Sequence, residues 1–127
     1  QAPVLTSFQA VVEYCKSCMS HLKTEQLRLL FLDSRQQLIK DEVHQQGTVN
    51  EVNAHVREIV KRALELGAVN IILVHNHPSG KADPSRADID FTNRVISGLE
   101  TVDISLIDHI IIGKGEHSSL RKLGYIA

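Results

Sequence analysis

The chain has 127 residues, 43% of them hydrophobic, which predicts one globular domain with a single core. The formal net charge is −1, so no global field attracts the chain to nucleic acid or to a membrane surface. No apolar run approaches the roughly 20 residues that a membrane-spanning helix needs, and no signal peptide is evident.

The first predicted element is a helix over residues 4–21. Apolar residues recur in it at three- and four-residue spacing: Val4, Phe8, Val11, Val12, Cys15 and Met19. Cys15 and Cys18 have the spacing of a redox or zinc motif, but a zinc knuckle needs a second ligand pair, which His21 alone does not supply. We therefore interpret both cysteines as small helix residues of a protein in the reducing cytoplasm.

A hairpin and a second helix are expected next. Glu25 precedes an apolar strand that ends at Asp33-Ser34, and residues 37–44 alternate weakly, as a hairpin partner would. Residues 49–52 are expected to add a short extended piece. An amphipathic helix is predicted over 55–66, with Gly67 as its C-terminal cap. Its inward positions are expected to be Val56, Ile59, Val60, Ala63 and Leu64.

The second half of the chain alternates strands and helices. A buried strand is predicted over 69–75, a helix from about Ser85 to Leu99, an apolar strand over 104–112 and a short strand near 117–120. The resulting order, αββαβαββ, suggests an α/β sandwich around a mixed sheet. We expect residues 1–22 to be a helix that leads into, or belongs to, a domain over 23–127.

The predicted strand at 69–75 runs directly into His75-Asn76-His77-Pro78. Side chains two apart on a strand share one face about 6–7 Å apart, so both imidazoles can bind one metal ion. Pro78 and Gly80 turn the chain, and Ser85 looks like a helix N-cap with Asp88 in the first turn. The turn can bring Asp88 back as a third ligand, and two histidines with one carboxylate form the ligand set of a catalytic zinc site.

The same residues resemble a known signature. His75-x-His77-Pro78 followed by Ser85-x-x-Asp88 looks like the JAMM motif of MPN-domain metalloproteases. With Ser79-Gly80, Pro84-Ser85 and the downstream Asp108-His109, the string is similar to the RadC family of bacterial proteins over about residues 20–125. Val56 departs from the proline that such sequences carry before Arg-Glu.

The resemblance implies an MPN-like fold, a Zn²⁺ cofactor and a hydrolase of amide bonds acting on a protein or peptide. JAMM enzymes use a glutamate upstream of the histidines as the base; Glu25 matches it, and Glu42 in the hairpin partner is the alternative. The serine that matches Ser85 helps to stabilise the oxyanion in JAMM enzymes, and Ser85 can also act as a helix cap.

Asp108-His109 interrupts an apolar strand, and buried polar groups need partners. The pair either supports a ligand histidine or is structural at a strand kink. We assign neither as a ligand. Four further histidines lack ligand-like spacing and are expected at the surface: His21, His44, His55 and His117.

Two other functions compete with the hydrolase. The RadC name implies a DNA-repair or recombination accessory protein, but near-neutral charge and 4% aromatic residues favour at most weak nucleic-acid association. A third candidate is a binding module of the same fold that has lost catalysis. No membrane partner is expected, and the sequence does not address the oligomeric state. Because the chain begins at Gln1 rather than Met, we expect it to be a fragment of a longer protein. The resemblance to the RadC family implies that the missing part includes a helical N-terminal region.

Overall fold

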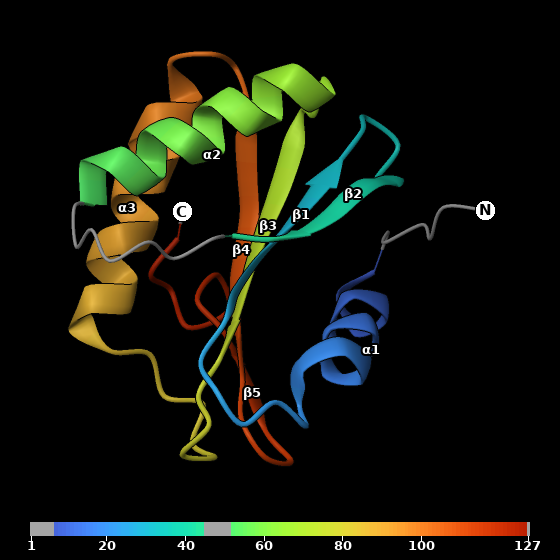
Figure 1. Ribbon diagram of the computed structural model, residues 1–127, viewed down its shortest axis with the longest axis vertical. Coiled ribbons are helices and arrows are strands. Elements are labelled where there is room, and N and C mark those ends of the chain that lie inside the picture. The colour runs from blue at the N-terminus through green and yellow to red at the C-terminus, as the bar shows by residue number, and fades with distance from the viewer. Residues whose placement is uncertain (1–6, 45–51, 127) are drawn as a thin grey trace.

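The computed structural model describes residues 7–44 and 52–126 of the chain. Within them lie α1 (Phe8–Met19), β1 (Leu27–Leu32), β2 (Leu38–Val43), α2 (Val52–Leu66), β3 (Asn70–Asn76), α3 (Arg86–Glu100), β4 (Ser105–Ile112) and β5 (His117–Ser119). The strands form one sheet in the order β2-β1-β3-β4-β5 (Figure 1). β3 and β4 are parallel and the other neighbours are antiparallel, which confirms the α/β fold with a mixed sheet.

The sheet is covered on both faces by helices (Figure 1). Alternate strand residues point to opposite faces, so each central strand contributes to two apolar clusters. Leu73 of β3 belongs to the cluster that includes α2 and α3, whereas Ile72 and Val74 belong to the cluster that includes α1. No helix of the described residues has the length and apolar character that crossing a membrane requires.

Helix α1 begins later than the periodicity predicts. Ser7 is its N-cap, and the Ser7 side chain accepts a hydrogen bond from the Ala10 N–H at 3.1 Å. Val4 lies outside the described residues. Cys15 is buried and Cys18 partly buried in this helix, and both are free thiols, as expected for helix residues with no disulfide. Burial is the main reason that the pKa of the Cys15 thiol rises to about 12, so this thiol stays protonated.

Helix α2 differs from its prediction in where it begins and in which of its residues face the core. It begins at Val52, three residues before the predicted start. The extended piece expected at 49–52 otherwise lies outside the described residues. The inward assignment of Leu64 is wrong: its exposed fraction is 55%, and Leu66 packs on the core instead. The buried stripe is centred on Ile59 and Ala63, which turns Leu64 to solvent.

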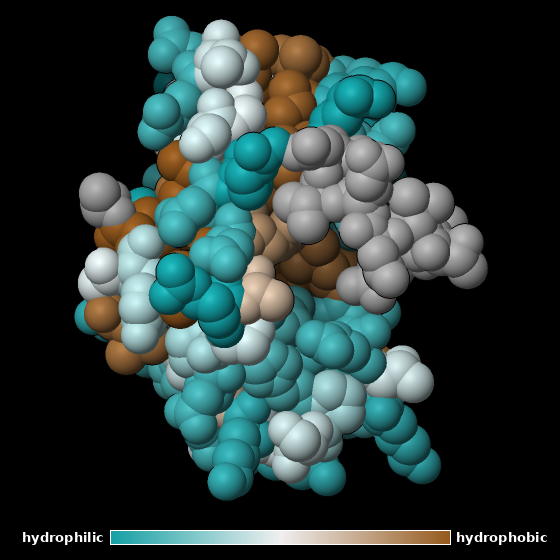
Figure 2. Space-filling model, turned by 90° about the vertical axis from the view of Figure 1, so that its left-hand side faces the viewer, coloured by the Kyte–Doolittle hydropathy of each residue, from teal (hydrophilic) through white to brown (hydrophobic). Residues whose placement is uncertain are grey.

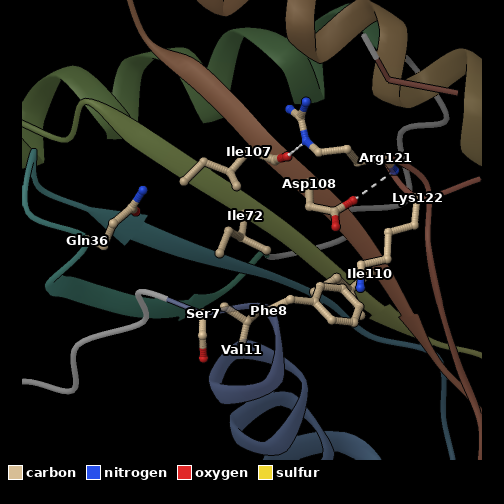
Figure 3. A pocket seen from close by; sticks show the side chains of 10 residues that line it. All are labelled: Ser7, Phe8, Val11, Gln36, Ile72, Ile107, Asp108, Ile110, Arg121 and Lys122. Atoms are coloured by element: carbon tan, nitrogen blue, oxygen red, sulfur yellow. Dashed lines mark hydrogen bonds between the residues drawn. The ribbon is translucent and has the colours of Figure 1, made fainter. Parts of the chain in front are cut away.

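A β-bulge in β4 decides where Asp108 and His109 point. Leu106 faces α2 and α3, so strict alternation would return Asp108 to that same face. The register with β3 instead shifts between Ile71 and Ile72. Asp108 therefore pairs with Ile72 and lies beside a cavity of about 220 Å³ on the α1 face (Figure 3). His109 pairs with Leu73 and faces α3.

Candidate metal centre

His75 and His77 converge at the end of β3. Their Nε2 atoms lie 2.9 Å apart, as expected for side chains that share one strand face. His75 is buried and His77 partly exposed. Asn76 points to the other face, where its side chain accepts a hydrogen bond from the Gln26 N–H at 2.7 Å and donates one to the Thr24 carbonyl at 2.9 Å. These two bonds hold the residues on either side of Glu25 against the end of β3.

Glu25 lies at the exposed side of the two imidazoles. Its Oε2 is 3.2 Å from His75 Nε2, and its side chain is 57% exposed. Glu25, His75 and His77 each offer a ligand atom, and these atoms all lie within 4.8 Å of one another. This cluster can hold a metal ion.

Asp88 approaches the same two nitrogens from the first turn of α3. Its Oδ1 is 3.4 Å from His75 Nε2 and its Oδ2 is 3.4 Å from His77 Nε2. Ser85 and Asp88 form a reciprocal capping box: the Ser85 hydroxyl accepts from the Asp88 N–H at 3.0 Å, and Asp88 Oδ2 accepts from the Ser85 N–H at 2.8 Å. The cap that starts the helix thus also orients the carboxylate.

Burial and hydrogen bonding set the charges at this point. Burial lowers the pKa of His75, so its imidazole is neutral at neutral pH, the form that binds metals. Partial burial alone would raise the pKa of Asp88. The hydrogen bonds from Ser85 and the nearby His75 outweigh that effect and lower the Asp88 pKa, so the group is a carboxylate.

The loop between β3 and α3 is anchored on the turn after β4. The His77 N–H donates to the Ile112 carbonyl at 2.9 Å, and the Lys114 N–H donates to the Gly80 carbonyl at 2.8 Å. The Ala82 N–H donates to Glu116 Oε2 at 3.1 Å. His77 Nδ1 lies 3.0 Å from the Lys81 carbonyl within the same loop. These contacts fix the path from His77 to the start of α3.

Two buried side chains, His109 and Thr92, form a hydrogen-bonded chain that leads from His75 into the protein interior. His109 Nε2 is 2.9 Å from His75 Nδ1, and His109 Nδ1 is 2.5 Å from the Thr92 hydroxyl. The sequence left open whether Asp108-His109 supports a ligand histidine or is a structural pair. In the structure His109 contacts His75, whereas Asp108 makes structural hydrogen bonds on the other face of the sheet. Asp108 accepts bonds from the Ser119 hydroxyl and the Arg121 N–H on the far face, where Figure 3 shows it. Thr92 was not predicted, although it lies one helical turn after Asp88, which is the signal that could have identified it.

The other candidate base and the remaining histidines lie elsewhere. Both Glu42 carboxylate oxygens accept hydrogen bonds from Arg62 of α2 at 2.9–3.0 Å, and this contact lowers the pKa of Glu42. His44 and His55 are partly exposed, and His44 Nε2 lies 2.9 Å from His55 Nδ1. His117 is also partly exposed and lies against Phe8, whereas His21 is exposed as predicted.

The surface near this centre is hydrophilic. Figure 2 shows the side with α3, and the residues of its lower half are mostly polar. The loop after β3 and the start of α3 lie in that lower half, since the two views share the vertical axis. Ser85 is exposed there. Within the centre, the Glu25 side chain is 57% exposed and that of His77 is 18% exposed, so the centre is accessible to solvent.

A family model for the RadC-like JAB domain matches residues 5–125 of the chain. This match spans every described helix and strand, together with the residues of the metal centre. The αββαβαββ order, the mixed sheet and the clustering of Glu25 with His75 and His77 agree with it. The chain therefore belongs to the RadC family and consists largely of its JAB domain of the MPN type.

Proposed function

We propose that this protein is a zinc-dependent hydrolase of amide bonds that acts on a protein or peptide. The observation that carries the proposal is the convergence of two imidazole nitrogens and two carboxylates on one solvent-accessible point. A single carboxylate near a histidine is ordinary, whereas here two carboxylates from separate segments of the chain approach the same imidazole nitrogen, and their mutual repulsion favours a cation at this point.

The donor set fits zinc. His75 and His77 offer Nε2, and the carboxylates add oxygen donors, which is the composition of catalytic zinc sites with two histidines and one acidic residue. Asp88 is the better candidate for the third ligand, because its side chain is 15% exposed and its orientation is held by Ser85. Glu25 is the better candidate for the base, because its side chain is 57% exposed and therefore accessible to a water molecule.

A bound Zn²⁺ would supply Lewis acidity, which polarises a carbonyl group and lowers the pKa of a coordinated water from 15.7 to about 7. Glu25 then takes a proton from the attacking water and delivers it to the leaving amine. In this proposal Ser85 donates its hydroxyl proton to the carbonyl oxygen as negative charge develops; its oxygen accepts a hydrogen bond from the Asp88 N–H, which leaves that proton free to be donated. Glu42 is the weaker candidate for the base, since Arg62 occupies both of its oxygens.

The test compares two isosteric substitutions. Glu25→Gln removes the base and keeps the shape, so we expect bound zinc to remain near one equivalent while hydrolysis falls by about 10²–10⁴-fold. Asp88→Asn replaces a charged ligand by a neutral one, so we expect weaker zinc binding itself. Metal content is measured on the purified protein, and activity by mass spectrometry on peptide and isopeptide libraries.

Glu42→Gln is the matched control and should retain zinc and activity. Full activity in Glu25→Gln together with loss in Glu42→Gln would place the base on β2. Full zinc occupancy in the His75→Ala, His77→Ala double variant would overturn the metal site.

A further inference from the structure

We infer that Thr92 and His109 are positioning residues that hold His75 in one tautomer, with the proton on Nδ1 and the Nε2 lone pair directed at the metal centre. The inference rests on the proposed metal at His75 and His77. The inference concerns which ring nitrogen of His75 carries the proton. The answer follows from a chain of hydrogen bonds that runs from Thr92 on α3 through His109 on β4 to His75.

The chain begins at the Thr92 hydroxyl. A hydroxyl has one proton to donate and lone pairs to accept. Thr92 Oγ1 lies 2.7 Å from the Asp88 carbonyl, which can only accept, so the hydroxyl proton points there. Thr92 Oγ1 also lies 2.5 Å from His109 Nδ1. With its proton already committed, the hydroxyl must accept in this second contact, and His109 must carry its proton on Nδ1.

The second step passes through His109. This side chain is 1% exposed, and its two ring nitrogens contact a hydroxyl and a second imidazole rather than a carboxylate, so the buried ring is neutral and has one N–H. With that proton on Nδ1, His109 Nε2 is an acceptor. His75 Nδ1 lies 2.9 Å from it and must therefore be the donor. The neutral His75 ring then has no proton on Nε2.

A separate contact gives His77 the same tautomer. His77 Nδ1 lies 3.0 Å from the Lys81 carbonyl, which can only accept, so Nδ1 carries the proton. Both Nε2 lone pairs consequently face each other across 2.9 Å. Two bare lone pairs repel at this distance, and a cation held by His75 and His77 would remove the repulsion. Thr92 and His109 therefore fix the tautomer of His75, although neither of them belongs to the cluster of possible metal ligands.

The bulge in β4 is what makes this chain possible. Without the register shift between Ile71 and Ile72, alternation would turn His109 to the α1 face and Asp108 toward His75. A carboxylate at that place would bring negative charge, whereas His109 provides a neutral acceptor. The bulge thus selects which of two adjacent polar side chains supports the metal centre.

The test uses a matched pair at position 92. Thr92→Val removes the hydroxyl and keeps the side-chain shape, so His109 Nδ1–H loses its acceptor and the ring can adopt the other tautomer, which donates to His75. Thr92→Ser keeps the hydroxyl and is the control. We expect Thr92→Val to bind Zn²⁺ about 10–100-fold more weakly than wild type, measured by competition with a chromophoric chelator, and Thr92→Ser to bind within a few-fold of wild type.

A second pair tests the same chain at His109. A glutamine there offers a carbonyl oxygen to His75 Nδ1–H and an amide N–H to Thr92, whereas a leucine offers neither. We expect His109→Gln to keep most of the Zn²⁺ affinity that His109→Leu loses. Circular dichroism and thermal unfolding identify any variant that does not fold, so each affinity is compared among folded proteins only.

The decisive readout needs no metal and no activity. Nitrogen-15 NMR of the metal-free protein reports which ring nitrogen of His75 is protonated. We expect protonation on Nδ1 in wild type and Thr92→Ser, and a shift toward Nε2 in Thr92→Val. Protonation of His75 on Nε2 in wild type, or equal zinc affinity in the Val and Ser variants, overturns the inference. Absence of zinc binding by wild type overturns the proposed function instead, and the NMR result still decides the tautomer.

Discussion

At the scale of single residues, the most unusual electrostatic environment is that of His109. Its ring is buried between β4 and α3, and burial together with His75 lowers its pKa to about 3. In the unfolded chain the same group titrates near 6.5. A group whose folded pKa is depressed stabilises the fold fully only above its unfolded pKa, and this contribution is lost as the pH falls from about 6.5 toward 3.

We therefore predict that His109→Gln is less sensitive to acid than wild type. In the metal-free protein, lowering the pH from 7.5 to 5 should reduce the unfolding free energy of wild type by up to about 2 kcal/mol more than that of the variant. This upper bound follows because each pH unit below 6.5 contributes about 1.36 kcal/mol. Urea denaturation in the presence of EDTA at both pH values measures this difference. His21→Gln, at an exposed position, is the control and should keep the wild-type response. An equal loss in His109→Gln would mean that His109 is not buried in neutral form.

At the scale of elements, the loop between β3 and α3 connects two metal-centre residues to the turn after β4. Gly113 packs directly against it: a Cβ on Gly113 would lie 2.3 Å from the Gly80 carbonyl oxygen and 3.2 Å from the Ala82 nitrogen. These are backbone atoms, so they cannot move aside as a flexible side chain would. Glycine at 113 lets the turn approach the loop closely enough for Lys114 N–H to bond to Gly80.

Gly113→Ala should therefore displace the loop that carries His77. We expect a loss of about 1–3 kcal/mol in unfolding free energy, the usual cost of overpacking, and weaker Zn²⁺ binding because the loop links His77 to Asp88. Denaturant titration and chelator competition measure the two effects. Lys114→Ala changes the exposed neighbour and should leave both near wild type. If Gly113→Ala unfolds at the wild-type denaturant concentration, the contact between turn and loop is looser than described.

At the scale of the whole molecule, the sheet separates two kinds of surface. The α1 face carries an apolar cavity with the hydrogen-bonded Asp108 at its edge (Figure 3). The opposite face carries α2, α3 and the candidate metal centre, which lies beyond the carboxyl end of β3 next to the start of α3. Crevices outside the carboxyl ends of strands are common binding sites in α/β proteins, because helix starts and strand ends meet there.

The charge of the whole chain gives a prediction about nucleic acid. With 14 Lys and Arg residues against 15 Asp and Glu, little counterion release is available on DNA binding. We predict at most weak binding that falls steeply with salt, measured by fluorescence anisotropy with single- and double-stranded oligonucleotides at 50 and 150 mM salt. Tight, sequence-selective binding at the higher salt would favour a role as a DNA-repair accessory protein over the hydrolase.

The sequence by itself determined the elements and the ligand pair. Strand β3, the shared face of His75 and His77, and the helix start at Ser85 follow from local signals: apolar runs, period-two alternation and capping residues within a few positions of each other. These features depend on neighbours along the chain, so they can be predicted without knowing the fold. Leu64 is the exception within α2, because the centre of the buried stripe depends on what the helix packs against.

Only the tertiary structure decided which distant groups meet. Glu25 and Glu42 both adjoin the hairpin, and the sheet order brings Glu25 to His75 while Arg62 of α2 binds Glu42. Asp108 and His109 point to opposite faces, as neighbours on a strand do, but the bulge in β4 decides which of the two faces His75. No local signal along the chain indicates either outcome, because strand pairing and register depend on contacts between residues far apart in the chain. A single register shift reverses which face each side chain occupies.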